Sequence, residues 1–116
     1  MTTTKERPKK LAGDSHRVLT GCGKLYITIN SLDGKVFEVF ARLGKAGGCM
    51  QCYTEVLSKS ISIGLRSGIS LERFHKILSE VKCNMPSYDE GELILSCADA
   101  MAKVIKKYLP KDDSAK

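Results

Sequence analysis

The chain contains no tryptophan and few aromatic residues, which make up 6% of its 116 residues. Its longest apolar runs, such as residues 61–65, are interrupted well short of the roughly 20 residues that a membrane span requires. The first ten residues are polar and lack the apolar core of a signal peptide. We therefore expect a cytoplasmic protein with no membrane segment.

The five cysteines do not fit a disulfide framework, because their number is odd and disulfides are rare in the cytoplasm. Cysteines in a reducing compartment are more often free thiols or metal ligands. A chain of this length can bury one hydrophobic core without disulfides. We expect that core in residues 16–110, between a flexible basic arm at residues 1–15 and a flexible tail at residues 111–116.

The net charge of +6 is concentrated at the two ends of the chain. Residues 1–18 and residues 100–116 each hold five Lys and Arg against two acids, whereas residues 19–99 hold nine of each sign. Basic ends are candidate docking elements for nucleic acid, a nucleotide or an acidic protein. No aromatic–basic RNA motif and no recognition-helix pattern accompanies them.

Two β-hairpins are predicted in the first half of the chain. Residues 17–20 and 24–30 are strand candidates on either side of a tight turn that carries Cys22 at its tip. Asp33-Gly34 is a strong hairpin signal, and residues 35–43 continue as a third strand. The return strand should therefore end near Cys22.

Three helices are predicted after these strands. The first should run from about Cys49 to Arg66, and the second from an N-cap at Ser70 to residues 82–83. Residues 84–91 are expected to form a loop, and a third helix should follow until Pro110 stops it. The stripes expected to be buried are Met50, Tyr53, Leu57, Ile61, Gly64 and Leu65 in the first helix, Leu71, Phe74, Leu78 and Val81 in the second, and Ala98, Met101, Ala102, Ile105, Tyr108 and Leu109 in the third. The resulting fold class is α+β, with an antiparallel sheet of about three strands packed against three helices in two layers.

The segment before the first helix has the composition of an anion-binding loop. Gly47 and Gly48 permit backbone conformations closed to other residues and bring Cys49 to a helix start, with Lys45 close by. A helix N-terminus stabilises negative charge, including that of a thiolate. An inert buried cysteine after a glycine-rich loop is the alternative.

Four cysteines share a position at the ends of predicted elements. Cys22 lies at a turn, Cys49 and Cys97 lie at helix starts, and Cys83 follows a helix end. Core fillers would instead follow the periodicity of the buried stripes. Four thiolates suit zinc or an iron–sulfur cluster, with zinc preferred because no sequence feature demands redox chemistry. Cys52, one turn after Cys49, is a fifth ligand, a redox partner of Cys49 or a spectator.

The start of the third helix has a capping pattern beside one of these cysteines. Ser96 and Asp99 have the spacing of a capping box with aspartate in the usual Glu or Gln place, and Cys97 would then be the first helical residue. We therefore expect Ser96 and Asp99 to support the site.

Several stretches of the sequence resemble one known family over roughly residues 7–109. They are TGCGKLYITIN at residues 20–30, FEVF at residues 37–40, LGKAGGC at residues 43–49 and LSCAD at residues 95–99. The family is the TSCPD domain, the C-terminal domain of adenosylcobalamin-dependent ribonucleotide reductases, named after a Thr-Ser-Cys-Pro-Asp signature. The LSCAD stretch keeps the Ser, Cys and Asp of that signature.

The resemblance implies a site and limits the function. The family's four recurrent cysteines correspond to Cys22, Cys49, Cys83 and Cys97, whereas Cys52 is not part of that pattern. The reductase's barrel, radical-forming cysteine and cobalamin site have no counterpart here, so the chain is not expected to reduce a nucleotide by itself. The expected function is that of a stand-alone metal-binding accessory domain that binds or regulates a reductase or another partner.

Two alternatives remain open. One is a thiol redox carrier that uses Cys49 and Cys52. The other is an iron–sulfur scaffold or carrier, because the order of Cys22, Cys49 and Cys97 is loosely similar to that of IscU-type scaffolds, which implies an IscU-like fold. Lys24 and Ser96 stand where those scaffolds carry an aspartate and a histidine, which argues against cluster transfer.

Overall fold

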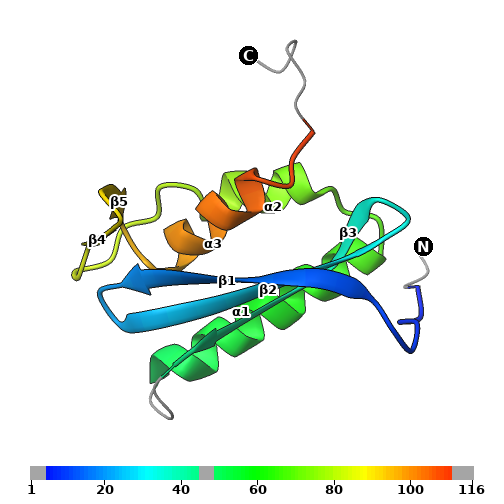
Figure 1. The fold of residues 1–116 in the computed structure, drawn as a ribbon, viewed down its shortest axis with the longest axis horizontal. Coiled ribbons are helices and arrows are strands. Elements are labelled where there is room, and N and C mark those ends of the chain that lie inside the picture. Colours follow the sequence, from blue (N-terminus) through cyan, green and yellow to red (C-terminus); the bar gives the residue numbers. More distant parts are fainter. Residues whose placement is uncertain (1–4, 45–48, 111–116) are drawn as a thin grey trace.

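A computed structural model describes residues 5–44 and 49–110 and confirms the α+β class (Figure 1). Strands β1 (Ala12–Thr20), β2 (Gly23–Leu32) and β3 (Lys35–Leu43) form one antiparallel sheet in the order β1-β2-β3. Thr20 pairs with Gly23, so Cys22 lies in a two-residue turn as predicted. Asp33 and Gly34 have φ angles of 54° and 81°, as in the mirror-image turns that match the twist of a hairpin.

The sheet buries one of its faces. Leu25, Ile27 and Ile29 of β2 are at most 1% exposed and belong to the same core as Ile61 and Met101 from the helices. Burial of each such side chain contributes about 1.5–3 kcal/mol. The alternate strand residues point away from the helices and form a second face.

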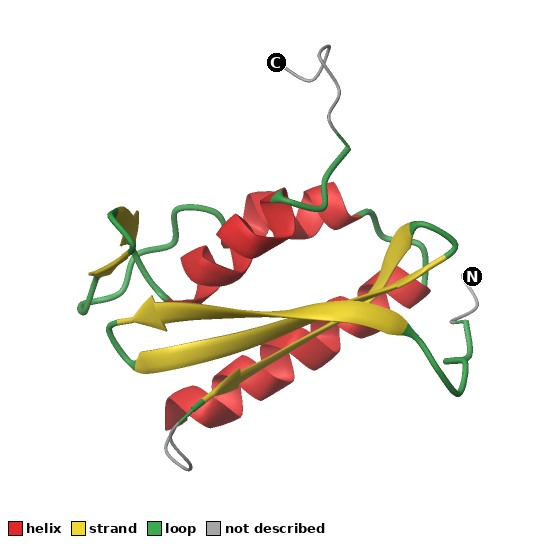
Figure 2. Ribbon diagram, viewed as in Figure 1, coloured by secondary structure: helices red, strands yellow, loops and turns green. Residues whose placement is uncertain are grey.

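Helix α1 (Cys49–Arg66) has the predicted bounds but a different buried face, because it packs closely on β3 (Figure 2). Ser62 Oγ donates to the Val39 carbonyl oxygen at 2.7 Å and accepts from the Val39 N–H at 2.9 Å. Small side chains permit this approach, and the buried residues are Thr54, Ser58, Ile61, Ser62 and Gly64. The prediction for Met50 and Tyr53 was wrong, since they are 40% and 66% exposed.

Helix α2 (Leu71–Leu78) ends about four residues before its predicted end. Glu80 has a φ angle of 63°, outside the helical region, and its N–H donates to Asp99 Oδ1 at 3.0 Å. A tertiary hydrogen bond thus replaces the next helical one. Val81, predicted to be buried, is 42% exposed as a result.

Helix α3 (Cys97–Lys106) begins at the predicted cap. Ser96 Oγ accepts from the Asp99 N–H at 3.0 Å, and Asp99 Oδ2 accepts from the Leu95 N–H at 3.0 Å. The reciprocal contact therefore reaches one residue further back than in a standard capping box.

A short hairpin occupies the region that was predicted to be a loop. Strands β4 (Ser87–Asp89) and β5 (Glu92–Ile94) pair around Glu90 and Gly91, whose φ angles are 48° and 85°. Asp89 Oδ1 accepts from the Leu19 N–H at 3.1 Å, which holds this hairpin against β1. The sequence pattern missed it because each strand is only three residues long.

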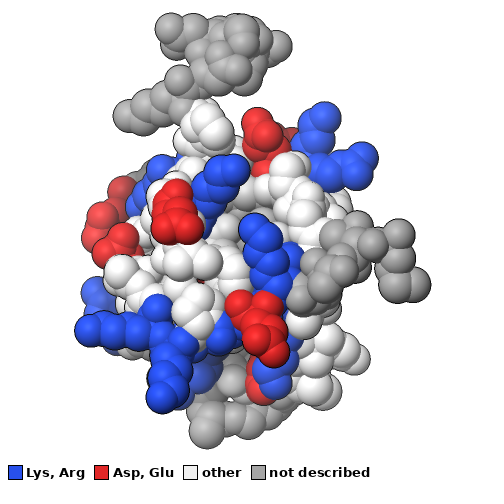
Figure 3. Space-filling view, turned by 90° about the vertical axis from the view of Figure 1, so that its right-hand side faces the viewer, with Lys and Arg blue, Asp and Glu red and all other residues white. Residues whose placement is uncertain are grey.

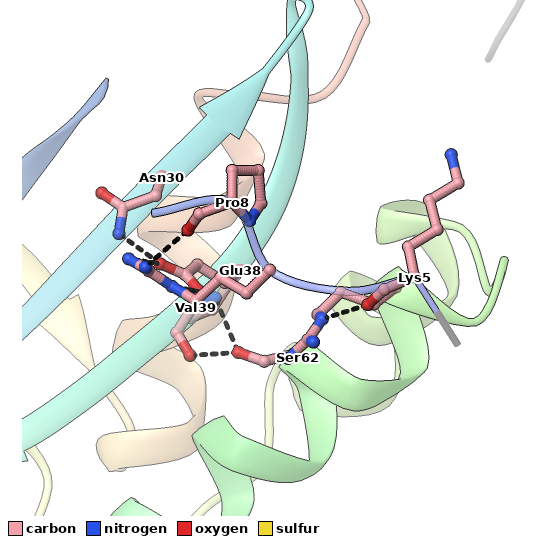
Figure 4. Close-up of polar contacts among 8 residues, drawn as sticks. Lys5, Pro8, Asn30, Glu38, Val39 and Ser62 are labelled. Atoms are coloured by element: carbon pink, nitrogen blue, oxygen red, sulfur yellow. Dashed lines mark hydrogen bonds and ion pairs between the residues drawn. The ribbon is translucent and has the colours of Figure 1, made fainter. Parts of the chain in front are cut away.

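Part of the predicted arm, residues 1–15, contacts the domain. Strand β1 starts at Ala12, and the segment before it contacts the domain (Figure 4). Arg7 forms a bidentate ion pair with Glu38 at 2.9 and 3.0 Å, and Lys5 N–H donates to the Arg66 carbonyl oxygen at 3.1 Å. Glu38 is 1% exposed and needs such a partner, because an unpaired buried carboxylate is costly.

Within residues 5–44 and 49–110, no helix is long and apolar enough to cross a membrane. Figure 3 shows the molecule from the right-hand side of Figure 1. On this face Lys and Arg side chains are mixed with those of Asp and Glu.

Candidate functional site

A pocket of about 390 Å³ lies at the edge of the domain where the turn between β1 and β2 meets the start of α3. Its other walls are the first turns of α1 and the segment after α2. Cys22, Cys83 and Cys97 line it, each from a different element. The fold thus brings three of the four cysteines that were predicted to share a site to one pocket, across 75 positions of sequence.

Thr20 connects the turn to the helix start. Its hydroxyl lies 3.6 Å from Cys97 Sγ, accepts from the Cys22 N–H at 3.1 Å and donates to the Gly23 carbonyl oxygen at 2.8 Å. Thr20 is 4% exposed, so its polar group needs these partners. One buried hydroxyl therefore positions two of the cysteines.

Cys83 is held against the start of α3 by the backbone. Its N–H donates to the Leu95 carbonyl oxygen at 3.1 Å, and Ser96 Oγ donates to the Val81 carbonyl oxygen. The Met85 N–H donates to Cys83 Sγ at 3.3 Å, which helps to fix the position of that sulfur.

Asp99 also holds the Cys83 segment against the start of α3. Its carboxylate accepts from the backbone N–H groups of Glu80 and Leu95 and from Lys103 Nζ, at 3.0, 3.0 and 2.7 Å. Burial alone would raise the pKa of Asp99, but these three donors outweigh it and hold the pKa below its usual value. Ser96 and Asp99 thus both attach the Cys83 segment to the start of the Cys97 helix.

The pKa of Cys97 depends on the neighbouring thiols. Burial raises the pKa of Cys97, the hydroxyl of Thr20 opposes that shift, and the neighbouring Cys22 and Cys83 raise it further because adjacent negative charges repel. A thiolate at Cys97 would therefore need a positive partner to stabilise its charge. Lys82 lines the same pocket.

Cys49 and Cys52 do not line the pocket. Cys49 is exposed at the first position of α1, next to Met50, which does line it. Cys52 is also exposed, and all five thiols are free. The predicted residues Lys45, Gly47 and Gly48 lie outside the described residues, and among the described ones no group of three or more His, Cys, Asp or Glu side chains is arranged to hold a metal ion.

The apolar walls of this pocket were not predicted from the sequence. Met50, Met85 and Met101 all line it, together with Tyr53 and Leu57. Met50 and Tyr53 had been placed on a buried stripe and instead form an exposed rim. Their position at the start of α1 was a partial indication of this exposure, because side chains at a helix end have fewer neighbours.

Comparison with known proteins gives one family match and no structural match. No solved structure is significantly similar to this chain. The similarity to IscU-type scaffolds stays a prediction. The family model that matches is the TSCPD domain, which covers residues 1–109 of the 116. The chain belongs to the TSCPD domain family.

Proposed function

We propose that this protein is a metal-binding accessory domain whose site is formed by Cys22, Cys83 and Cys97 with Cys49 as the fourth ligand. The observation that carries the proposal is the convergence of three thiols, from a turn, a loop and a helix start, on one pocket. Each is placed by specific hydrogen bonds of the surrounding backbone and side chains, which free core cysteines do not require.

The donor set suits zinc. Three thiols line the pocket without a carboxylate or an imidazole, and sulfur donors select zinc, iron–sulfur clusters or copper(I) over harder cations. Cys49 immediately precedes the lining residue Met50 at the start of α1, and the proposal assigns it as the fourth sulfur of the set.

Charge compensation is available for such a site. Zn²⁺ with four thiolates has a net charge of −2, which Lys82 and the N-terminal ends of α1 and α3 partly offset. When bound, zinc supplies a cross-link between α1, the Cys83 segment and α3, worth about 10–16 kcal/mol of apparent binding free energy in structural sites.

The function of such a domain is to bind or regulate, and not to reduce nucleotides by itself. Exposed apolar side chains surround the pocket, including Tyr53, Val81 and Met85 at 66%, 42% and 52% exposure. Such a rim suits a protein partner, for which a ribonucleotide reductase is the first candidate because of the family. The basic ends of the chain are further docking elements for that partner, a nucleotide or nucleic acid.

Elemental analysis and native mass spectrometry of the purified protein test this proposal. We expect one zinc per chain and its loss in Cys→Ser variants at positions 22, 49, 83 and 97. Cys52→Ser is the matched control, because Cys52 shares helix α1 and exposure with Cys49 but does not line the pocket, and it should retain the metal. Retention of zinc in three of the four ligand variants would refute the site.

Two other functions are distinguished by the same preparation. A brown protein with visible absorption after anaerobic purification would indicate an iron–sulfur cluster instead of zinc. A metal-free protein in which Cys49 and Cys52 cycle between thiol and disulfide would indicate a redox carrier. The latter is favoured by one observation, namely that both thiols are exposed and lie one turn apart on α1.

A further inference from the structure

The face of the sheet that points away from the helices carries a second constellation of residues. Register places Arg17, Tyr26 and Arg42 side by side in one row across β1, β2 and β3. All three are on the face opposite the buried Leu25 and Ile27. The centre of this open face is therefore an aromatic ring between two guanidinium groups.

The next row supplies a second ring. Phe40 pairs with Thr28, and Thr28 pairs with Ser15, whose hydroxyl lies 2.8 Å from the Thr28 hydroxyl. Phe40 and Tyr26 are thus diagonal neighbours, about 7–8 Å apart in a regular sheet. They are 40% and 36% exposed, so each ring presents surface to solvent while its base remains packed.

The ring of Tyr26 is held in place by its neighbour. A Cβ atom added to Gly44 would lie 3.1 Å from Tyr26 Cε2, so the ring rests directly on the Gly44 backbone. The aromatic surface at the centre of the face is therefore largely preformed, which lowers the entropy cost of binding.

Positive charge predominates among the strand residues of this face. Lys24 is exposed on the same side of β2 as Tyr26, and it adds a third cation to Arg17 and Arg42. Of the strand residues on this face, Glu38 is the acidic one, and Arg7 neutralises it through the bidentate pair at 2.9 and 3.0 Å. Asp89 of the neighbouring hairpin is also engaged, since it accepts from the Leu19 N–H at 3.1 Å, so the rows of Arg17, Lys24 and Arg42 favour a polyanion.

We propose that this face binds single-stranded nucleic acid, with bases stacked on Tyr26 and Phe40 and phosphates paired with Arg17, Arg42 and Lys24. Aromatic side chains on an open antiparallel sheet are a general way to bind unpaired bases, because every base has a π face. A polyanion is favoured over a second copy of this chain, because two such faces would place the like charges of Arg17, Lys24 and Arg42 against one another. The surface lies on the opposite side of the sheet from the core and does not depend on a metal at the cysteines.

The arrangement also explains why no nucleic-acid motif is visible along the chain. Arg17, Tyr26 and Arg42 are nine and sixteen positions apart, and only strand pairing brings them into a row. The proposal thus assigns nucleic-acid binding to the sheet in addition to the basic ends of the chain.

Fluorescence anisotropy with labelled oligo(U) and oligo(dT) of about 12 nucleotides tests the proposal on the full chain. Tyr26→Ala and Phe40→Ala should each weaken binding by about 5-fold to 100-fold, which corresponds to the usual loss of one stacked base. Tyr88→Ala is the matched control, because Tyr88 is 64% exposed on the β4–β5 hairpin, and it should change binding less than about 2-fold. A duplex of the same length should bind more weakly, since its bases cannot stack on the rings.

The salt dependence provides a second measurement that does not rely on the aromatic variants. Three phosphate contacts predict a slope of about −2 for the logarithm of the binding constant against the logarithm of the salt concentration. Arg17→Gln with Arg42→Gln should reduce the magnitude of that slope by about 1.4. Arg73→Gln, on exposed surface of α2, is the matched control and should leave the slope unchanged.

Three results would overturn the proposal. The first is parent-like affinity of the folded Tyr26→Ala/Phe40→Ala variant together with a parent-like salt slope of the arginine double variant. The second is equal affinity of the parent protein for duplex and single strand. The third is a parent protein that is dimeric in sedimentation while the aromatic variant is monomeric. The last would assign this face to a second copy of the chain. Circular dichroism confirms that each variant is folded before it is scored.

Discussion

Replacing Asp99 with asparagine alters a single buried group on which two segments of the fold depend. Asp99 is 1% exposed and accepts hydrogen bonds from the Glu80 N–H, the Leu95 N–H and Lys103 Nζ. Asparagine has nearly the same shape but one acceptor oxygen instead of two. One of the two backbone N–H groups must then face an NH₂ group, which donates and cannot accept.

The magnitude follows from the groups that lose their partners. A buried N–H without an acceptor costs about 1–3 kcal/mol. Loss of the negative charge in the first turn of α3 costs about 0.3–1 kcal/mol more. Lys103 contributes little, because its side chain is 28% exposed and can be hydrated instead. We expect Asp99→Asn to lower the free energy of unfolding by about 2–4 kcal/mol.

Urea denaturation at pH 7, followed by circular dichroism, measures this loss, and thermal unfolding should show a fall in Tm of about 8–15 °C. Lys103→Gln is the matched control, because it leaves both backbone contacts of Asp99 in place, and it should cost less than about 1 kcal/mol. Zinc affinity should also fall in Asp99→Asn, since Asp99 holds the Cys83 segment beside Cys97.

The pH dependence gives a separate check on the same group. The pKa of Asp99 is lowered in the folded state from 3.8, so its contribution is present at pH values above that number and is lost as the pH falls through the lower folded value. Asp99→Asn should therefore lose stability less steeply in this acidic range than the parent does. An Asp99→Asn variant within about 0.5 kcal/mol of the parent at pH 7 would contradict the assigned role of the carboxylate.

Two further predictions concern packing and charge away from the cysteines. Glu38→Gln should lower the free energy of unfolding at pH 7 by about 1–3 kcal/mol, because it breaks the charged pair with Arg7. Burial tends to raise the pKa of Glu38, but hydrogen bonds from Arg7 and Asn30 lower it below 4.5. The difference between variant and parent in the free energy of unfolding, measured by urea denaturation, should therefore shrink as the pH falls through that lower value. An equal difference at pH 7 and pH 2 would contradict the pairing. Gly64→Ala should lower the free energy of unfolding by about 1–3 kcal/mol despite the higher helix propensity of alanine, because the added Cβ would overlap the ring of Phe74. A variant that is more stable than the parent in thermal unfolding would show that α1 and α2 do not pack as described.

The local elements of this fold could be predicted where short-range signals decide them. The Asp33-Gly34 turn, the bounds of β3 and α1, and the cap at Ser96 all depend on residues within a few positions of one another. The grouping of Cys22, Cys83 and Cys97 followed from the same signals, because their positions at element ends place them at one edge of a two-layer domain.

Errors arose where a distant contact outweighed a local preference. Helix α2 stops early because the Glu80 N–H finds Asp99, nineteen positions away. Arg7 contacts the domain because Glu38 is buried and needs a partner. The small polar face of α1 is buried because Ser62 bonds to the backbone of β3.

The sequence by itself determined the order of the elements, the fold class and the family, since each rests on local patterns or on matching stretches. Only the tertiary structure decided which faces are open, because exposure depends on what packs against a residue and not on its own type. Strand pairing assembled the row of Arg17, Tyr26 and Arg42 from three separate strands, and the close packing of α1 on β3 turned Met50 and Tyr53 outward to the rim of the cysteine pocket.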